Sequence, residues 1–457
     1  MSATETAGAD TRAGLLRFVT AGSVDDGKST LIGRLLYDSK GLFADQITAV
    51  QAASRRRGFA DIDLSLLTDG LVAEREQGIT IDVAYRYFAT PARKFIIGDS
   101  PGHVQYTRNM VTAASTADVA VLLVDASQGL QPQTRRHAYL ARWLGIPRIA
   151  LAVNKMDLVG FDRARYEAIR DAFEAFARPL GFAEIREIPM SALRGDMVVV
   201  RGAADADPDA AAPELAWYDG PTLLEWLETV PSRHDDAARH ASAAVLRFPV
   251  QRVARVMLGN AQPDARIAAG EFRGYQGTVA SGTLAVGDEV VALPSGTLAR
   301  VAELVTADGA LDAAGPDCAV TVRLDRDIDV SRGDILTCPT SRPALVREID
   351  ADLCWFDAEP LSPARTYLVK HGTRTVRARF DRIAWRVDVE TLEQVAAPET
   401  LAMNDVARVH LRTQAPLAVD AYADNRVTGA FIVIDETTHH TVAAGTVARA
   451  EAVAATP

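Results

Sequence analysis

The sequence predicts a mostly parallel α/β domain with helices on both faces of its sheet, followed by two all-β barrel domains. Three observations support this prediction. A glycine-rich loop joins an apolar strand to a helix near the start of the chain, strands and helices then alternate, and short β-rich runs between Gly, Asp and Pro turns fill the second half. We expect domains at 14–235, 243–340 and 346–450, after a disordered leader at 1–13.

Apolar periodicity locates the elements of the first domain. Strands are predicted at 15–21, 81–88, 94–99, 118–125, 148–154 and 184–190, and helices at 28–36, 133–144, 162–177 and 222–227, while a further helix can form at 44–53. Thr90-Pro91-Ala92 is a turn signal between the second and third strands, so we expect these two to form an antiparallel hairpin. Strand and helix alternate from there on, which predicts parallel pairing.

Short β-rich runs predict the two barrels. Strands are expected at 246–250, 277–281, 288–293 and 319–324 in the first barrel, and at 367–371, 376–383, 405–411 and 431–435 in the second. The Ala- and Asp-rich stretch 202–213 is expected to be a surface loop, and 260–270 an inserted loop.

Composition and charge narrow the function classes. The 457 residues carry a formal net charge of -11, which disfavours loose electrostatic binding to nucleic acid or to an anionic membrane. We expect no signal peptide, and the longest apolar run, 119–124, is too short to span a bilayer. Three widely spaced cysteines, at 318, 338 and 354, fit neither a disulfide framework nor a zinc site, so a reducing, cytoplasmic compartment is expected.

The glycine-rich loop at 22–29 fits the phosphate-binding pattern G-x-x-x-x-G-K-[ST] without a mismatch. Gly22 and Gly27 let the backbone wrap closely around a diphosphate, whose oxygens the N–H groups at the start of the next helix can bind. Lys28 can reach the β- and γ-phosphates, and the Ser29 hydroxyl can ligate Mg²⁺. The predicted nucleotide-binding residues here are Gly22, Ser23, Val24, Asp25, Asp26, Gly27, Lys28, Ser29 and Thr30.

A second motif, Asp99-Ser100-Pro101-Gly102-His103, follows the strand at 94–99. Asp99 can hold Mg²⁺ through water, and Gly102 can offer its N–H to a γ-phosphate because no side chain intervenes. Thr80 precedes Asp99 by 19 residues (99 − 80), the distance that a strand–turn–strand hairpin covers. Its hydroxyl can complete the Mg²⁺ shell while a γ-phosphate is present, and loss of that contact after hydrolysis would release the segment.

Two further motifs predict a guanine site. Asn154-Lys155-Met156-Asp157 follows an apolar strand, and the Asp157 carboxylate can accept hydrogen bonds from the 1-NH and 2-NH₂ of guanine, a donor pair that adenine lacks. Asn154 can hydrogen-bond the purine edge, and the stem of Lys155 can lie along the ring. Ser191-Ala192-Leu193 follows the next strand and can offer a backbone N–H to guanine O6. All four motifs lie at the carboxyl ends of predicted strands, where open α/β sheets bind ligands.

The four motifs, in this order, resemble those of the translational-factor GTPases, the class that includes elongation factor Tu. The resemblance implies a P-loop GTPase domain that binds GTP or GDP with Mg²⁺. In that class the histidine of Asp-x-Pro-Gly-His positions the attacking water, which implies this role for His103. Val24 and Ile79 match the hydrophobic gate that screens this histidine until a partner binds. The implied catalytic residues are His103, Thr80 and Lys28, and the implied metal ligands are Ser29, Thr80 and Asp99.

Longer stretches resemble one branch of this class, the GTPase subunits of bacterial ATP sulfurylase, also called sulfate adenylyltransferase. The resemblance covers about 13–447 and depends on the segments 69–87, 101–110, 217–225, 272–282, 327–334 and 425–431. It departs at Val104, where an acidic residue is expected, and in the stretches 203–212 and 260–270. None of these departures falls in the nucleotide motifs.

This resemblance implies an enzyme of two proteins, as a heterodimer or a higher heteromer. A smaller sulfate adenylyltransferase subunit would bind ATP and sulfate and form adenosine 5′-phosphosulfate and pyrophosphate, the first step of sulfate assimilation toward cysteine. GTP hydrolysis on this chain would drive that uphill reaction. No nucleic-acid or membrane partner is implied, and we expect the C-terminal adenylylsulfate kinase that some relatives carry to be missing here.

Two other functions stay open from the sequence. An elongation factor that delivers aminoacyl-tRNA would share a GTPase domain and two barrels, and a regulatory switch would couple GTP hydrolysis to no chemistry. Ribosome-stimulated hydrolysis without adenylylation would favour the elongation factor. A product yield that stays unchanged when hydrolysis is blocked would favour the switch.

Overall fold

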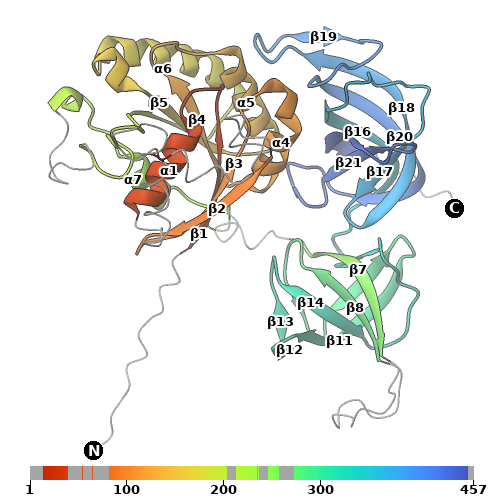
Figure 1. The fold of residues 1–457 in the computed structure, drawn as a ribbon. Coiled ribbons are helices and arrows are strands. Elements are labelled where there is room, and N and C mark those ends of the chain that lie inside the picture. Colours follow the sequence, from red (N-terminus) through yellow and green to blue (C-terminus); the bar gives the residue numbers. More distant parts are fainter. Residues whose placement is uncertain are drawn as a thin grey trace, which may run out of the picture. The chain divides into compact units, whose positions relative to one another are not determined.

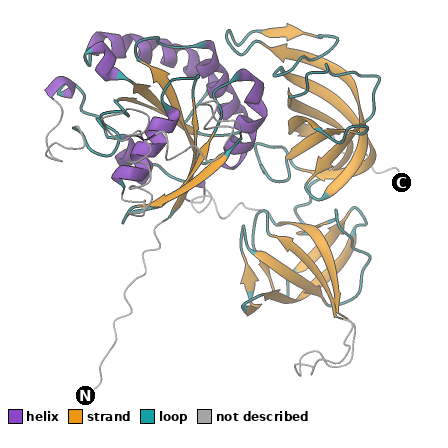
Figure 2. Cartoon of the chain, viewed as in Figure 1, coloured by secondary structure: helices purple, strands orange, loops and turns teal. Residues whose placement is uncertain are grey.

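The structure is a computed structural model that describes residues 14–39, 54, 64, 82–202, 213–233, 235, 245–256 and 272–450. The chain forms two compact units, Met1–Asp236 and Ala237–Pro457. The described part of the first combines helices and strands, and that of the second consists of strands and turns (Figure 2). The predicted leader at 1–13, the helix at 44–53 and the loops at 203–212 and 260–270 lie outside the described residues.

A six-stranded sheet forms the centre of the first unit (Figure 1). Its order is β2-β3-β1-β4-β5-β6, in which β2 is antiparallel to β3 and every other pair is parallel. The predicted hairpin is thus confirmed. All residues of β4 are buried, which explains its unbroken apolar sequence, because a central parallel strand is covered on both faces. The strands are β1 (Leu15–Ala21), β2 (Ala84–Ala89), β3 (Lys94–Asp99), β4 (Val119–Asp125), β5 (Arg148–Asn154) and β6 (Glu184–Pro189).

Helices cover both faces of this sheet (Figure 1). α4 contacts α5 and α5 contacts α6 along one face, while α1 and α7 lie on the other. The Asp162 carboxylate caps α6, and Thr222 and Glu225 form a reciprocal capping box at the start of α7. None of the described helices is long and apolar enough to cross a membrane. The helices are α1 (Lys28–Asp38), α4 (Thr107–Thr116), α5 (Pro132–Trp143), α6 (Arg163–Ala177) and α7 (Leu223–Thr229).

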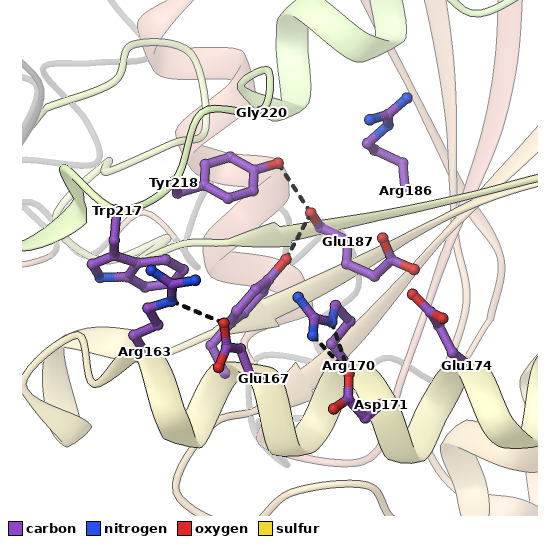
Figure 3. Close-up of a pocket in the computed structure, with 11 residues that line it drawn as sticks. Arg163, Glu167, Arg170, Asp171, Glu174, Arg186, Glu187, Trp217, Tyr218 and Gly220 are labelled. Atoms are coloured by element: carbon purple, nitrogen blue, oxygen red, sulfur yellow. Dashed lines mark hydrogen bonds and ion pairs between the residues drawn. The ribbon is translucent and has the colours of Figure 1, made fainter.

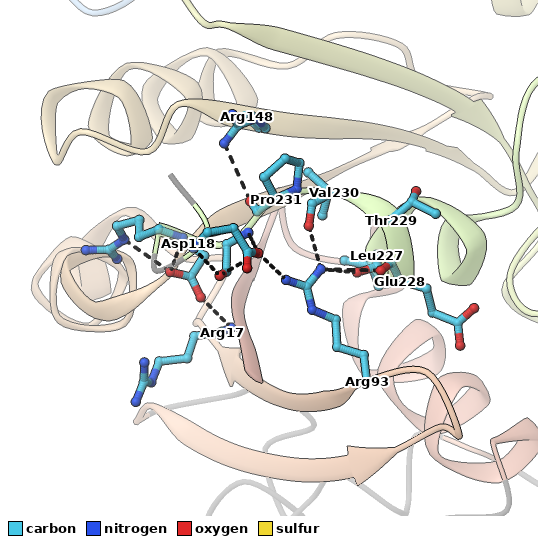
Figure 4. A network of polar contacts seen from close by, with 12 residues as sticks. Arg17, Arg93, Asp118, Arg148, Leu227, Glu228, Thr229, Val230 and Pro231 are labelled. Atoms are coloured by element: carbon cyan, nitrogen blue, oxygen red, sulfur yellow. Dashed lines mark hydrogen bonds and ion pairs between the residues drawn. The ribbon is translucent and has the colours of Figure 1, made fainter. Parts of the chain in front are cut away.

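Polar contacts connect α7 and β1 to the residues that flank β3 and β4 (Figure 4). The Arg93 guanidinium, next to β3, donates to the carbonyl oxygens of Leu227, at 3.2 Å, and of Val230, at the end of α7. Asp118, next to β4, accepts from the N–H of Arg17 at 2.8 Å. Because the last carbonyl groups of a helix have no partner within the helix, the cation both satisfies them and fixes where α7 ends.

Two antiparallel sheets, each closed on itself, form the barrels of the second unit. The first has the order β10-β15-β7-β8-β14-β11-β12 and closes through β10 and β11; the second has the order β17-β21-β22-β16-β20-β18-β19 and closes through β17 and β18. The predicted fold class is therefore confirmed. The first barrel contains β7 (Arg247–Val256), β8 (Phe272–Thr278), β9 (Leu284–Ala285), β10 (Glu289–Leu293), β11 (Thr297–Thr306), β12 (Gly309–Leu311), β13 (Ala313–Ala314), β14 (Ala319–Leu324) and β15 (Ile335–Thr337). The second contains β16 (Ala344–Trp355), β17 (Tyr367–His371), β18 (Arg374–Val387), β19 (Gln394–Ala396), β20 (Val406–Val419), β21 (Ala430–Asp435) and β22 (Thr441–Ala450).

A buried ion pair joins the two barrels. The Arg247 guanidinium, at the start of β7, donates two hydrogen bonds of 2.7 Å to the carboxylate of Asp420, which follows β20. The Arg247 side chain is 3% exposed and that of Asp420 12%. Although burial acts to raise it, the hydrogen bonds from Arg247 and Thr428 hold the pKa of Asp420 below its usual value.

Arg247→Ala is expected to destabilise the second unit by about 3–5 kcal/mol, because the Asp420 carboxylate is left buried without its cation. Hydrogen–deuterium exchange of the barrel strands in the full chain measures this separately from the first unit. Arg323→Ala is the matched control, because it breaks a pair with Glu303 whose side chains are 44% and 33% exposed. This control substitution should lower the stability of the second unit by less than about 1 kcal/mol. Equal loss of protection in both variants would contradict the prediction.

Candidate functional site

The loop between β1 and α1 has the backbone shape that phosphate binding requires. Asp25 (φ 66°) and Gly27 (φ 92°) adopt left-handed conformations that turn the chain into the helix. A side chain at Gly27 is excluded, because its Cβ would lie 2.5 Å from Nδ2 of Asn154. No described side chain caps α1, and its first turn holds no acidic residue. The N–H groups at the start of α1 are thus arranged as an anion site needs.

Lys28 is buried inside this loop. Its ammonium donates to the carbonyl oxygens of Gly22 at 3.1 Å and Ser23 at 2.6 Å. Burial lowers the pKa of Lys28, and the carboxylates of Asp26 and Asp99 oppose this shift. The Ser23 hydroxyl oxygen is buried and has no hydrogen-bond partner in the described part of the chain. A cation and an unsatisfied hydroxyl therefore lie where a bound phosphate would accept hydrogen bonds.

Asp26 is turned into the loop rather than out of it. The side chain is buried, and one carboxylate oxygen accepts from the N–H of Ser23 at 2.5 Å. Burial raises the pKa of Asp26. Val24 and Asp25 lie at the exposed tip of the loop, and Ser29 and Thr30 are half-buried in the first turn of α1.

The second motif lies against the phosphate loop. Asp99, at the end of β3, is buried and accepts from the Thr20 hydroxyl at 3.3 Å. Ser100 and Pro101 are also buried. A Cβ on Gly102 would lie 2.6 Å from Nζ of Lys28 and 3.0 Å from the carbonyl oxygen of Gly22. A side chain at this position would meet both groups, so the backbone at Gly102 lies close to the Lys28 ammonium; its approach to a γ-phosphate stays a prediction.

His103 occupies the turn that follows. Its carbonyl oxygen accepts from the N–H of Tyr106 at 3.0 Å, within the short 3₁₀ turn Val104–Tyr106 that leads into α4. The half-buried imidazole packs edge-on against Tyr106, with ring centroids 6.1 Å apart. Thr80 and Ile79, the predicted metal ligand and gate residue, lie outside the described residues.

Asn154 joins three motifs at the end of β5. Its Nδ2 donates to the carbonyl oxygen of Asp26 at 2.8 Å, and its Oδ1 accepts from the N–H of Ala192 at 2.9 Å. Both ends of this amide therefore contact backbone, whereas the sequence suggested a contact with the purine edge. Asn154 thus holds the phosphate loop and the 191–193 loop in a fixed relation.

Lys155 and Asp157, the residues predicted to contact the base, follow β5. Lys155 has a left-handed backbone (φ 60°), and its ammonium pairs with the Asp125 carboxylate at 2.9 Å, which stretches the stem across the site. Asp157 lies in the 3₁₀ turn Met156–Val159, above the fully buried Met156. Oδ1 of Asp157 is buried and has no hydrogen-bond partner among the described residues. An acceptor of this kind fits the donor pair of guanine, because a buried polar atom without a partner is costly.

The 191–193 loop is held by hydrogen bonds. The buried Ser191 accepts from the N–H of Arg194 at 3.2 Å, and the Ala192 N–H is taken by Asn154. The Leu193 side chain is 67% exposed. The N–H of Ser191 donates to the carbonyl oxygen of Asp196 and that of Ala192 to Asn154, so among the described contacts of these three residues the N–H of Leu193 is the donor that could bind guanine O6.

Sequence reasoning missed Asp125 and Arg34. Asp125 ends β4 opposite Asn154 of β5, so its place at the carboxyl end of a strand was a signal that could have identified it. Arg34 lies in the middle of α1, and its guanidinium donates to carbonyl oxygens of the 191–193 loop. Its hydrogen-bond partners are 158 and 159 residues away in the chain, so no local sequence pattern indicates these contacts.

The described residues contain no group of three or more His, Cys, Asp or Glu side chains that could hold a metal. In nucleotide sites Mg²⁺ is typically bound by one or two protein groups together with phosphate oxygens and water. The Asp99 carboxylate and the Ser29 hydroxyl are the described groups that could supply them.

A second hollow, of about 380 Å³, lies apart from these motifs, between α6, β6 and 217–220 (Figure 3). The hydroxyls of Tyr166 and Tyr218 both donate to the carbonyl oxygen of Glu187, at 3.1 and 3.0 Å. Burial, together with the charge of Glu174, raises the pKa of Glu187 to about 7. Figure 3 shows the two carboxyl groups turned toward each other. No motif in the sequence predicted this hollow.

Comparisons with known proteins agree with the geometry. The family described as elongation factor Tu GTP binding domain matches residues 14–233, and the family described as GTP-eEF1A C-terminal domain-like matches residues 348–448. The chain is 48% identical to a sulfate adenylyltransferase subunit 1 of Methylorubrum populi, over 95% of this chain and 87% of that protein. It is 47% identical to the protein of the same name from Shewanella woodyi, over 94% of this chain and 86% of that one.

Longer relatives match as well. The chain is 52% identical to the bifunctional enzyme CysN/CysC of Mycobacterium tuberculosis over 95% of its own length. It is 49% identical to the bifunctional enzyme NodQ of Rhizobium sp. over 94%. It spans 67% of the first and 63% of the second, so it corresponds to about two thirds of these bifunctional relatives.

Proposed function

The chain belongs to the sulfate adenylyltransferase subunit 1 family, whose GTP-binding domain is of the elongation factor Tu type, and we propose that it is the GTPase subunit of a heteromeric sulfate adenylyltransferase. The Oδ1 of Asp157, which is buried and has no hydrogen-bond partner among the described residues, carries the guanine-binding part of this proposal. The adenylylation part is supported by the relatives named for that reaction, which match nearly the whole chain.

Different residues of this chain would bind the phosphates, the guanine base and the attacking water. The N–H groups at the start of α1 and the Lys28 ammonium would hold the phosphates, while Asp157 and the N–H of Leu193 would read guanine. Lys155, drawn across the site by Asp125, would cover one face of the base. Gly102 would approach the terminal phosphate through its backbone, and His103, next in the chain, would position the attacking water.

Mg²⁺ fits the residues at the phosphate end of this site. Asp99 is a buried carboxylate at the end of β3, and its charge acts on Lys28, which places it near the phosphate loop. We propose Ser29, Asp99 and Thr80 as the protein ligands. When bound, the ion would neutralise charge that develops on the phosphate oxygens.

Coupling to adenylylation requires a partner. We propose a smaller subunit that binds ATP and sulfate, in a heterodimer or larger heteromer. The segment that contains Thr80 and the turn at Gly102 and His103 would contact that subunit differently in the GTP and GDP states. Only such a difference lets the free energy of GTP hydrolysis shift an equilibrium on another protein.

Copurification followed by an activity assay tests this function. The full chain, together with the smaller subunit from the same cell, should convert ATP and sulfate to adenosine 5′-phosphosulfate, and omission of GTP should lower the yield. A GTP analogue that cannot be hydrolysed should fail to restore it. Stimulation of GTP hydrolysis by ribosomes, without adenylylation in the presence of the partner, would contradict the proposal and favour an elongation factor.

A further inference from the structure

Arg34 connects the 191–193 loop, which is proposed to bind guanine, to α1, the helix that follows the phosphate loop. Its side chain, on α1, is 13% exposed. Nε donates to the carbonyl oxygen of Ala192 at 3.2 Å and a terminal nitrogen donates to that of Leu193 at 2.5 Å, while the other terminal nitrogen lies 3.5 Å from the Asp38 carboxylate. The guanidinium thus donates hydrogen bonds to two successive carbonyl groups of a loop that lies 158 residues away in the sequence.

One of these carbonyl groups controls where an N–H points. The C=O of Ala192 and the N–H of Leu193 belong to the same planar peptide unit, and in a trans peptide they point in opposite directions. When Arg34 holds the oxygen, it therefore fixes the direction of the N–H. The preceding peptide is fixed separately, because Asn154 accepts from the N–H of Ala192.

Packing of the Leu193 side chain does not fix the direction of the Leu193 N–H. Leu193 is 67% exposed, so its own side chain anchors the peptide weakly. A hydrogen bond from a cation to the carbonyl oxygen also polarises the peptide, and this strengthens its N–H as a donor. Both effects act on the one backbone group that is left for guanine O6.

We propose that Arg34 is a positioning residue for base recognition, one that aims the Leu193 N–H at guanine O6. The proposal depends on the guanine-binding part of the proposed function. It predicts that loss of Arg34 weakens the reading of O6 selectively and leaves the Asp157 contact intact. A merely structural role would weaken every nucleotide to the same extent.

Two analogues separate these outcomes. 6-Thio-GTP replaces O6 by sulfur, a weaker acceptor, and keeps the donors that face Asp157, whereas ITP lacks the 2-amino group and keeps O6. In the unaltered chain 6-thio-GTP should bind about two- to tenfold more weakly than GTP, the effect of one hydrogen bond. In Arg34→Met this ratio should fall toward one, while the ratio of ITP to GTP stays unchanged. Arg34→Lys, which keeps the charge, should recover part of the O6 preference.

Arg142→Met is the matched control. Arg142 on α5 also binds two successive carbonyl oxygens: its Nε donates to those of Leu180 at 2.9 Å and Gly181 at 3.1 Å, which belong to a turn outside the proposed base site. An unchanged 6-thio-GTP ratio in Arg34→Met, or the same change in Arg142→Met, would overturn the inference. Failure of the unaltered chain to bind guanine nucleotides would instead overturn the proposed function.

Discussion

His103→Ala is expected to slow partner-stimulated GTP hydrolysis by about 10²–10⁴-fold, the range over which a positioned side chain assists a reacting water. His103 directly follows Gly102, whose backbone lies close to the Lys28 ammonium. The imidazole packs edge-on against Tyr106. GTP affinity should therefore stay near that of the unaltered chain, and the loss should appear in the rate of hydrolysis.

Single-turnover hydrolysis of GTP, with and without the smaller subunit, measures the effect, and displacement of a fluorescent GDP analogue measures affinity. His440→Ala is the control, because this exposed histidine lies in the second unit. A normal rate of hydrolysis in the His103 variant would show that another group positions the water. Lost GTP binding would show that His103 shapes the pocket instead.

Motifs that bind through their own backbone could be predicted from the sequence. Gly27 and Gly102 are examples, because a glycine where a loop turns or approaches another backbone reflects a local steric demand. The carboxyl ends of β1, β3, β5 and β6 meet at one edge, so four motifs that each follow a predicted strand had to converge. The fold class and the placement of these motifs followed from the same spacing.

Contacts that depend on tertiary register could not be predicted. The Asn154 amide meets the backbone of Asp26 and Ala192, and Arg247 meets Asp420 from 173 residues away. Nothing near these residues in the sequence distinguishes them from exposed polar side chains. Their partners are set only once strands have paired and the barrels have closed.

Barrel strands were predicted too short for a related reason. The run at 376–383 belongs to β18 (Arg374–Val387), which begins two residues earlier and ends four residues later. Its ends are held by pairing with β17 and β19, so hydrogen bonding to neighbouring strands sets its length. The two-residue strands β9 and β13 carry no periodic pattern, because they are too short to show one.

Asp157→Asn is expected to exchange a preference for guanine for a preference for xanthine. The carboxylate offers acceptors only, and its Oδ1 is buried without a partner among the described residues, ready for the 1-NH and 2-NH₂ of guanine. The asparagine amide has one acceptor and one donor group, which matches the 1-NH and the 2-oxo group of xanthine. For GTP, the hydrogen bond from the 2-NH₂ to a charged acceptor, about 1.5–3 kcal/mol, is lost and two donors then face each other at a further cost of about 1–3 kcal/mol, so GTP affinity should fall about 10²–10⁴-fold.

Competition between GTP and XTP for the purified chain measures the exchange, and Asp171→Asn on α6, whose side chain is 66% exposed, is the matched control. Unchanged GTP affinity would contradict the role of Asp157 in base recognition, and equal weakening of GTP and XTP would show that the carboxylate only shapes the loop. With the smaller subunit present, XTP should restore adenosine 5′-phosphosulfate formation to the variant and GTP should not. Because the substitution changes only which base is accepted, that rescue would show that the nucleotide bound in this site supports the partner's reaction.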